Sequence, residues 1–131
     1  MESDARRALG RGGEELAAQH LRGLGFVVLG RNVRTVRGEI DVIARRGSLL
    51  VFAEVKTRRI GARQRSPRED QLPLGGLGAR QRARLRGLAV AWLADQGRSR
   101  PSATTIRFDA VGVVLDTSGR LRRLEHIEGA W

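Results

Sequence analysis

Residues 49–56 form a nearly continuous apolar segment, which limits the fold of this chain more than any other feature of its sequence. The segment is rich in β-branched and aromatic side chains, and its only charged residues, Glu54 and Lys56, lie near its C-terminal end. A run of this composition and length is typical of a strand that is buried on both faces. We therefore expect this strand inside a sheet that is covered on each side.

The other periodic segments predict helices and strands around this strand. A helical apolar pattern begins at Glu14 and ends before Gly25, and a second amphipathic pattern covers residues 79–96. Further strands are predicted over residues 26–29, 39–44, 106–115 and 121–127. The predicted order is α-β-β-β-α-β-β, an α/β fold with a central mixed sheet flanked by helices. A chain of this length, residues 1–131, fits a single domain with one core.

Residues 57–78 separate the third predicted strand from the second predicted helix. They contain two of the three prolines of the chain, several glycines and many arginines. Loops of this length inside compact domains are usually functional or disordered. We predict a long, mobile and basic loop over residues 60–78.

The chain is strongly basic, with 25 basic and 14 acidic residues and a formal net charge of +11. Such a balance favours a polyanionic partner, most simply nucleic acid. An arginine-rich composition can also raise the charge without serving a function. The distribution of the basic residues along the chain is more informative than their number. The segment from Arg58 to Arg86 contains nine arginines and only two acids, Glu69 and Asp70. This basic stretch begins two residues after Lys56, so we expect it to contact phosphates.

The composition also argues against several kinds of site and location. The chain has no cysteine, which excludes disulfides and thiolate zinc sites. His20 and His126 are its only histidines and lie far apart in the sequence, so a histidine-based catalytic pair has little support. No apolar run approaches the length of a membrane span, and the polar first residues do not resemble a signal peptide. We expect a cytoplasmic protein that has no membrane partner.

Two acids and the single lysine of the chain fall on neighbouring predicted strands. Lys56 follows Glu54 by two residues, and Asp41 ends a Gly-Glu-Ile-Asp sequence thirteen residues before Glu54. Residues i and i+2 of a strand project from the same face, so Glu54 and Lys56 should point together. Carboxylates suit Mg²⁺ or Mn²⁺, and an ammonium group stabilises charge on a phosphate. These residues are the minimum set for metal-dependent cleavage of a phosphodiester bond.

Five longer stretches extend this set over nearly the whole chain. They are Gly13-Glu14-Glu15-Leu16-Ala17, Asn32-Val33-Arg34, Gly38-Glu39-Ile40-Asp41-Val42-Ile43-Ala44, Val51-Phe52-Ala53-Glu54-Val55-Lys56-Thr57-Arg58 and Arg107-Phe108-Asp109. Together they resemble the PD-(D/E)XK nuclease superfamily, and within it the YraN family, small bacterial proteins similar to archaeal Holliday-junction resolvases. The resemblance implies a restriction-endonuclease-like core.

The resemblance also implies a role for each site residue. Asp41 and Glu54 would bind the divalent ion, Mg²⁺ or Mn²⁺, with the Val55 carbonyl as a third ligand. Lys56 would orient or help to deprotonate the attacking water and stabilise charge on the phosphorane. Glu14 matches the acid that completes the catalytic site in resolvase-like members.

The partners implied by the resemblance are branched DNA and, because resolvases cut two strands symmetrically, a second copy of the chain in a homodimer. The residues that we expect to bind nucleic acid are Arg34, Arg58, Arg59, Arg80 and Arg84. The chain departs from the family at Gln81, where members usually place a lysine. It also departs in the loop over residues 60–78, which is more basic than usual.

Simpler interpretations of the same residues stay open. Asp41 could pair with any of the many arginines, and Glu54 and Lys56 could form an ion pair of small energetic value. Glu14 could be favoured by the helix dipole alone. A charged pair at the end of an apolar strand is costly to bury without compensation, which favours a site. Two hypotheses follow: a metal-dependent endonuclease acting on branched or structured DNA, and a nucleic-acid-binding protein whose nuclease site is idle or vestigial.

Overall fold

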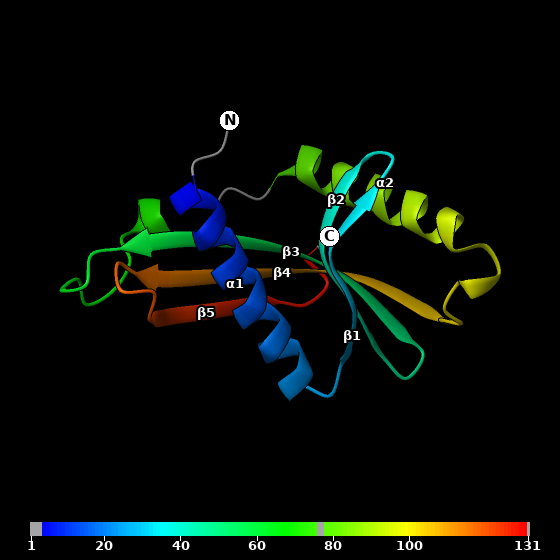
Figure 1. Cartoon of the computed structure of the whole chain (residues 1–131), viewed down its shortest axis with the longest axis horizontal. Helices are drawn as coiled ribbons and strands as arrows, with labels where there is room; N and C mark the ends of the chain where they lie inside the picture. Colours follow the sequence, from blue (N-terminus) through cyan, green and yellow to red (C-terminus); the bar gives the residue numbers. More distant parts are fainter. Residues whose placement is uncertain (1–3, 76–77, 131) are drawn as a thin grey trace.

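A five-stranded mixed sheet forms the centre of the molecule, seen here in a computed structural model (Figure 1). The structure describes residues 4–75 and 78–130, of which residues 4–11 by their backbone alone. The elements are α1 (Asp4–Gly23), β1 (Val27–Thr35), β2 (Gly38–Arg46), β3 (Leu49–Ile60), the 3-10 helix η1 (Glu69–Gln71), α2 (Ala79–Gln96), the 3-10 helix η2 (Gly97–Ser99), β4 (Thr105–Asp116) and β5 (Leu121–Ile127). The α/β class and the predicted order of helices and strands are confirmed.

The strands lie side by side in their chain order. Strands β3 and β4 are parallel from Leu49↔Thr105 to Ile60↔Asp116, whereas all other neighbours are antiparallel. Parallel neighbours need a long crossover connection, and the segment that contains α2 supplies it. The mixed sheet expected from the sequence is therefore present, and its parallel pair includes the central strand β3.

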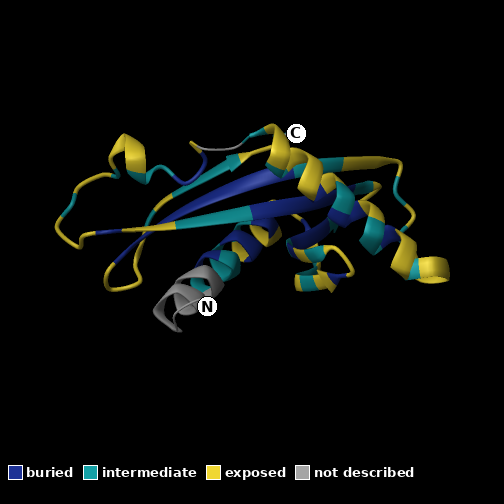
Figure 2. Cartoon of the chain, turned by 90° about the horizontal axis from the view of Figure 1, so that it is seen from above, coloured by how far each residue is buried: buried dark blue, intermediate teal, exposed yellow. Residues whose placement is uncertain are grey.

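The two helices cover opposite faces of the sheet, with most buried residues between them (Figure 2). Val51 and Ala53 of β3 belong to the core beneath α1, together with Leu21. The alternate β3 residues, such as Phe52, belong to the core beneath α2, together with Leu85. Because β3 contributes to both cores, nearly every residue of its first half must be apolar.

The ends of several elements differ from the prediction. Helix α2 and strand β5 have the predicted bounds, but β3 continues to Ile60, so residues 57–60 are strand rather than loop. The side chains of Arg58 and Arg59 are exposed, so the apolar pattern that predicts a strand ends before them. Their backbone nevertheless remains paired with β4. Strand β1 is also longer than expected. It lies at the edge of the sheet, where most of its residues are partly or fully exposed, so its second half lacks the apolar residues by which a strand is predicted. Helix α1 begins at Asp4, ahead of its apolar pattern.

Strand β2 pairs with β3 over only part of its length. Its register with β3 ends at Val42↔Ala53, whereas its register with β1 continues to the Thr35↔Gly38 pair. Beyond Val42 the β1–β2 hairpin leaves β3 and lies beside α2, so that Ile40 joins the core of that helix (Figure 1). Asp41 is therefore located where the two strands part.

The connection from β3 to α2 is attached to the sheet at two places. Leu74 is buried against Gly112 of β4, where an added Cβ would come within 2.9 Å of the Leu74 Cγ atom. Arg122 of β5 donates a 2.7 Å hydrogen bond to the carbonyl oxygen of Gln64. These contacts hold the connection against the end of the sheet that carries the charged part of β3, and the mobility expected for it stays a prediction.

Gly13 allows α1 to approach β3 closely, and its replacement should destabilise the protein. A Cβ at Gly13 would collide with the hydroxyl group of Thr57, whereas a Cβ at Gly12 would make an ordinary 3.6 Å contact with Leu115. Gly13→Ala should lower the free energy of unfolding by about 1–3 kcal/mol. Gly12→Ala should leave it unchanged or raise it by up to about 1 kcal/mol, because alanine favours helix. Urea denaturation measures both, and equal effects would contradict the close approach.

Candidate functional site

Glu54 and Lys56 lie where the buried part of β3 ends, and Glu54 points towards α2. The Lys56 Nζ atom is 3.0 Å from Glu54 Oε1, so the ion pair allowed by the sequence is formed. Glu54 is only 4% exposed, whereas the Lys56 side chain is 36% exposed. The pair is thus not an ordinary surface pair, because its carboxylate has lost most of its contact with water.

Asp41 is held beside Glu54 by the backbone of β3. Its Oδ2 atom accepts a 2.8 Å hydrogen bond from the Val55 N–H. Strand β2 does not pair with β3 at Val55, because the pairing of the two strands ends at Val42↔Ala53. The pKa of Asp41 is raised to about 6, chiefly by burial and also by the charges of Glu54 and Glu14, against the lowering effect of the Val55 hydrogen bond. Lys56 lowers it. Asp41 therefore lies in a group of like charges.

Glu14 approaches the same group from α1. Its negative charge acts on Asp41, and the neighbouring Gly13 lets the helix pack directly against Thr57 of β3. Because α1 begins at Asp4, Glu14 lies in the middle of the helix, and the interpretation that the helix dipole alone favours this acid is wrong. The structure brings the four predicted catalytic residues into one region, from α1, β2 and β3.

Arg84 of α2 completes the charged group, and the sequence did not predict this contact. Its Nη2 atom lies 2.9 Å from Glu54 Oε1 and 3.0 Å from Glu54 Oε2. Both carboxylate oxygens of Glu54 therefore accept a hydrogen bond from one guanidinium nitrogen. Arg84, which the sequence analysis expects to bind nucleic acid, is thus paired with Glu54, although half of its side chain is exposed.

The donor groups in this region fit a small divalent cation. Asp41 and Glu54 offer carboxylate oxygens beside the Val55 backbone, a hard set of the kind that Mg²⁺ and Mn²⁺ prefer. A divalent charge would also relieve the repulsion that raises the pKa of Asp41. Among the described side chains, those of residues 12–75 and 78–130, no group of three acidic or histidine residues is placed to hold a metal ion. The charge of Glu54 is instead compensated by Arg84 and Lys56.

A cavity of about 540 Å³ opens beside Lys56. It is lined by Lys56 and Arg58 of β3, by Gln81 of α2, and by loop residues that include Glu69 and Asp70. The Gln81 Oε1 atom is buried and has no hydrogen-bond partner in the part of the chain that the structure describes. The position at which the chain departs from the family pattern therefore offers an unsatisfied acceptor on a residue that lines the same cavity as Lys56.

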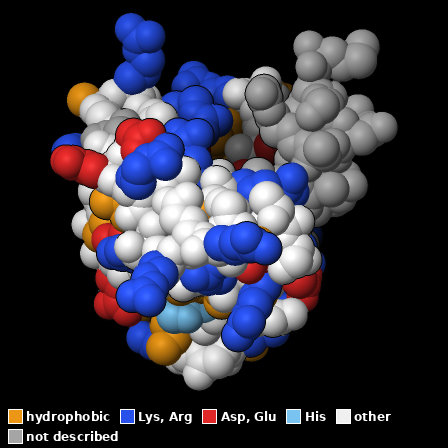
Figure 3. Space-filling model, turned by 90° about the vertical axis from the view of Figure 1, so that its left-hand side faces the viewer, with side chains coloured by type: hydrophobic (Ala, Val, Ile, Leu, Met, Phe, Trp, Pro, Cys, Tyr) orange, Lys and Arg blue, Asp and Glu red, His pale blue; other side chains and the backbone are white. Residues whose placement is uncertain are grey.

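The remaining arginines predicted to bind nucleic acid occupy different places. Arg58, Arg59 and Arg80 are exposed, and Arg58 also lines the cavity. Arg34 is 84% exposed on the β1–β2 hairpin, where it forms a 3.4 Å ion pair with Glu39. Figure 3 shows one end of the molecule, over which Lys and Arg side chains are spread with a few acids between them. That these arginines contact nucleic acid stays a prediction.

Comparison with known proteins decides the family. A family model described as Uncharacterised protein family UPF0102 matches residues 13–113, a range that contains Glu14, Asp41, Glu54 and Lys56. The chain belongs to the UPF0102 family. The resemblance to the YraN family is thereby confirmed, because the two names denote the same group.

Relatives of this UPF0102 protein match it over nearly its whole length. A UPF0102 protein of Acidothermus cellulolyticus is 44% identical over 136 residues, which cover 98% of this chain and 97% of the relative. UPF0102 protein SCO5602 of Streptomyces coelicolor is 43% identical, with 96% of this chain and 90% of the relative covered. A UPF0102 protein of Pelotomaculum thermopropionicum is 39% identical, with 98% and 99% covered. None of the helices in the described part of this chain is long and apolar enough to cross a membrane.

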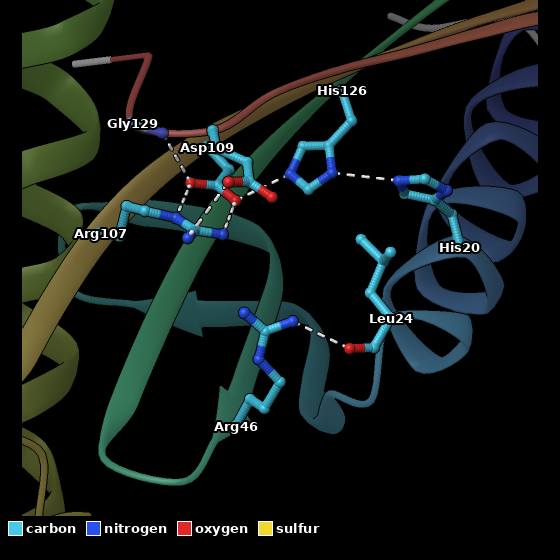
Figure 4. A network of polar contacts seen from close by, with 8 residues as sticks. His20, Leu24, Arg46, Arg107, Asp109, His126 and Gly129 are labelled. Atoms are coloured by element: carbon cyan, nitrogen blue, oxygen red, sulfur yellow. Dashed lines mark hydrogen bonds and ion pairs between the residues drawn. The ribbon is translucent and has the colours of Figure 1, made fainter.

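A second polar network, which the sequence did not predict, lies on the α1 face of the sheet (Figure 4). Asp109 is fully buried and accepts hydrogen bonds of 2.8 and 2.9 Å from Arg107 and of 3.0 Å from the Gly129 N–H. The Nε2 atom of His126 lies 2.8 Å from the same carboxylate, and its Nδ1 atom lies 3.0 Å from Nε2 of His20. The two histidines are therefore in contact, although 106 residues separate them.

This network attaches α1 and the end of the chain to β4. Although burial acts in the opposite direction, hydrogen bonds from Arg107, Gly129 and His126 hold the pKa of Asp109 below its usual value. Asp109 belongs to one of the stretches that carry the family resemblance, yet it lies on the face opposite Glu54 and Lys56. Its role here is to fix the fold around the site.

The raised pKa of Asp41 predicts that its ionisation destabilises the fold. The folded protein retains the Asp41 proton up to about pH 6, whereas the unfolded chain releases it near the ordinary value of 3.8, so stability falls as the pH rises between these values. Asp41→Asn should therefore raise the free energy of unfolding by about 1–3 kcal/mol at about pH 8 and by much less at about pH 4.

Urea denaturation at both pH values without metal ions tests this expectation. Asn keeps an oxygen that can accept the Val55 hydrogen bond, so the substitution removes the charge while preserving the contact. Asp95→Asn is a matched control, since Asp95 is exposed on α2 and should give no such pH dependence. A gain of equal size at both pH values would contradict the raised pKa.

Proposed function

We propose that the protein is a divalent-metal-dependent endonuclease that hydrolyses phosphodiester bonds in branched or structured DNA. The observation that carries this proposal is the meeting of Asp41, Glu54 and Lys56 at the point where β2 leaves β3. Two carboxylates and an ammonium group in one half-buried region are expensive to keep without a function. The cavity beside Lys56 gives a substrate phosphate access to the lysine.

In the proposed reaction each residue acts from its described place. Asp41 and Glu54 would hold a divalent ion, which would supply a more acidic water and polarise the phosphodiester. Lys56, whose Nζ atom lies 3.0 Å from Glu54 Oε1, keeps a positive charge where the phosphate oxygens gain negative charge. Asp41 must be ionised to bind the ion, so its pKa of about 6 predicts that cleavage rises through this pH.

The substrate class follows from what surrounds the site. Arg58 lines the cavity, and Arg59 and Arg80 are exposed next to Arg58 and Gln81 in the sequence. These arginines suit backbone phosphates, which position a nucleic acid without reading its sequence. The preference for branched DNA comes from the family resemblance, as does the expectation of a homodimer that cuts two strands symmetrically. A cytoplasmic location likewise stays a prediction from the sequence.

A second candidate function is supported by one specific contact. Arg84 and Lys56 neutralise Glu54 within the protein itself, as expected for a site that no longer recruits a metal ion. In that case the protein would bind nucleic acid through its net charge of +11 and would not cleave it. Such binding would weaken steeply with salt, with a slope set by the number of phosphates contacted.

A cleavage assay separates the two candidates. The panel holds four-way junctions, flaps, single strands and plain duplex, each with Mg²⁺, Mn²⁺ or EDTA. Wild type should cleave a branched substrate only with a divalent ion, and Glu54→Gln and Lys56→Ala should lower the rate by at least about 100-fold while DNA binding is retained. Asp95→Asn, an exposed acid on α2, is the matched control and should cleave normally.

Two outcomes would remove the endonuclease proposal. One is tight DNA binding without cleavage under every metal condition, which would favour the binding protein. The other is cleavage that Glu54→Gln leaves unchanged, which would trace the activity to a contaminant or to another site.

A further inference from the structure

Arg84 occupies the oxygens of Glu54 that a metal ion would need. One guanidinium nitrogen lies 2.9 and 3.0 Å from the two carboxylate oxygens, and Lys56 Nζ takes a second position at 3.0 Å from Oε1. A carboxylate lone pair that accepts an N–H cannot at the same time bind a cation. Arg84 and a divalent ion therefore compete for Glu54.

The two partners differ in their freedom to move. The Glu54 side chain is 5% exposed and is fixed within the sheet, whereas the Arg84 side chain is 51% exposed. The neighbouring residues Arg82 and Ala83 are exposed as well. Arg84 can turn outwards without loss of core packing, so the arriving ion would move the arginine and leave the carboxylate in place.

The charges in the region favour this exchange. The charges of Glu54 and Glu14 act on Asp41, and Lys56 and Arg84 pair with Glu54. A divalent ion that replaces Arg84 adds one positive charge to the region. An ion that enters beside Arg84 would add two, and it would also lie next to the guanidinium group.

We propose that Arg84 is an internal counter-ion that the divalent metal ion displaces, and that the displaced guanidinium then binds a DNA phosphate. This inference rests on the proposed function and deepens it, because it makes DNA binding by this arginine depend on metal. Without metal, Arg84 compensates the buried charge of Glu54 and keeps the site closed to cations. With metal, it becomes an additional cation at the edge of the cavity beside Lys56.

Titration of the full chain with Mn²⁺ by isothermal calorimetry at about pH 8 tests the competition directly. Arg84→Ala should bind Mn²⁺ about five- to tenfold more tightly than wild type, because the ion no longer has to replace a charged hydrogen bond from a half-exposed side chain. Arg82→Ala removes the same charge from the exposed face of the same helix and should change the affinity by less than about twofold. Glu54→Gln should abolish binding in either background.

DNA binding tests the second half of the proposal. With Ca²⁺ in place of Mn²⁺, Arg84→Ala should weaken binding to a branched DNA by about fivefold, because one phosphate contact is lost. In EDTA it should change binding by less than about twofold, because Arg84 is then engaged with Glu54. Equal losses in Ca²⁺ and in EDTA would overturn the metal-dependent release.

The outcomes keep this inference separate from the proposed function. Weaker or unchanged Mn²⁺ affinity in Arg84→Ala would overturn the inference while leaving a metal-dependent nuclease intact. Absence of Mn²⁺ binding in wild type and in Arg84→Ala alike would overturn both. Tighter binding in Arg84→Ala without DNA cleavage by either protein would support the exchange and contradict the nuclease.

Discussion

Burial of β3 on both faces is the constraint on which the rest of this structure depends. Its apolar first half can be covered only if one helix packs on each side of the sheet, which α1 and α2 do. The same burial places Glu54 where water does not stabilise its charge. The two cations that pair with Glu54, Lys56 and Arg84, can therefore be understood as compensation for a carboxylate that the fold has removed from solvent.

That compensation comes from elements distant in the sequence, which ties the charge of the site to the fold. Pairing between β2 and β3 ends at Val42↔Ala53. Just beyond this point, the Asp41 carboxylate accepts a hydrogen bond from the Val55 N–H. Helix α2, carried across the sheet by the parallel crossover, supplies Arg84. The buried carboxylate of Glu54 is thus paired with one cation from its own strand, Lys56, and with one from α2, Arg84.

The sequence predicts those parts of the structure that follow from the spacing of apolar and charged residues within one helix or strand. Helix α2 could be placed because its apolar residues recur at helical spacing, and the shared direction of Glu54 and Lys56 follows from the period of a strand. The engagement of Arg84 could not be predicted, because nothing in the sequence distinguishes it from the other arginines. The contact between His20 and His126 depends on long-range packing in the same way.

The most direct test of the account is a crystal structure of the full chain soaked in Mn²⁺, with data collected at an energy where manganese scatters anomalously. The account predicts one strong anomalous peak within about 2.0–2.3 Å of a carboxylate oxygen of Asp41 and one of Glu54, with Arg84 turned away from Glu54. A map without a peak in this region, or a peak elsewhere while Arg84 still holds both oxygens of Glu54, would contradict it.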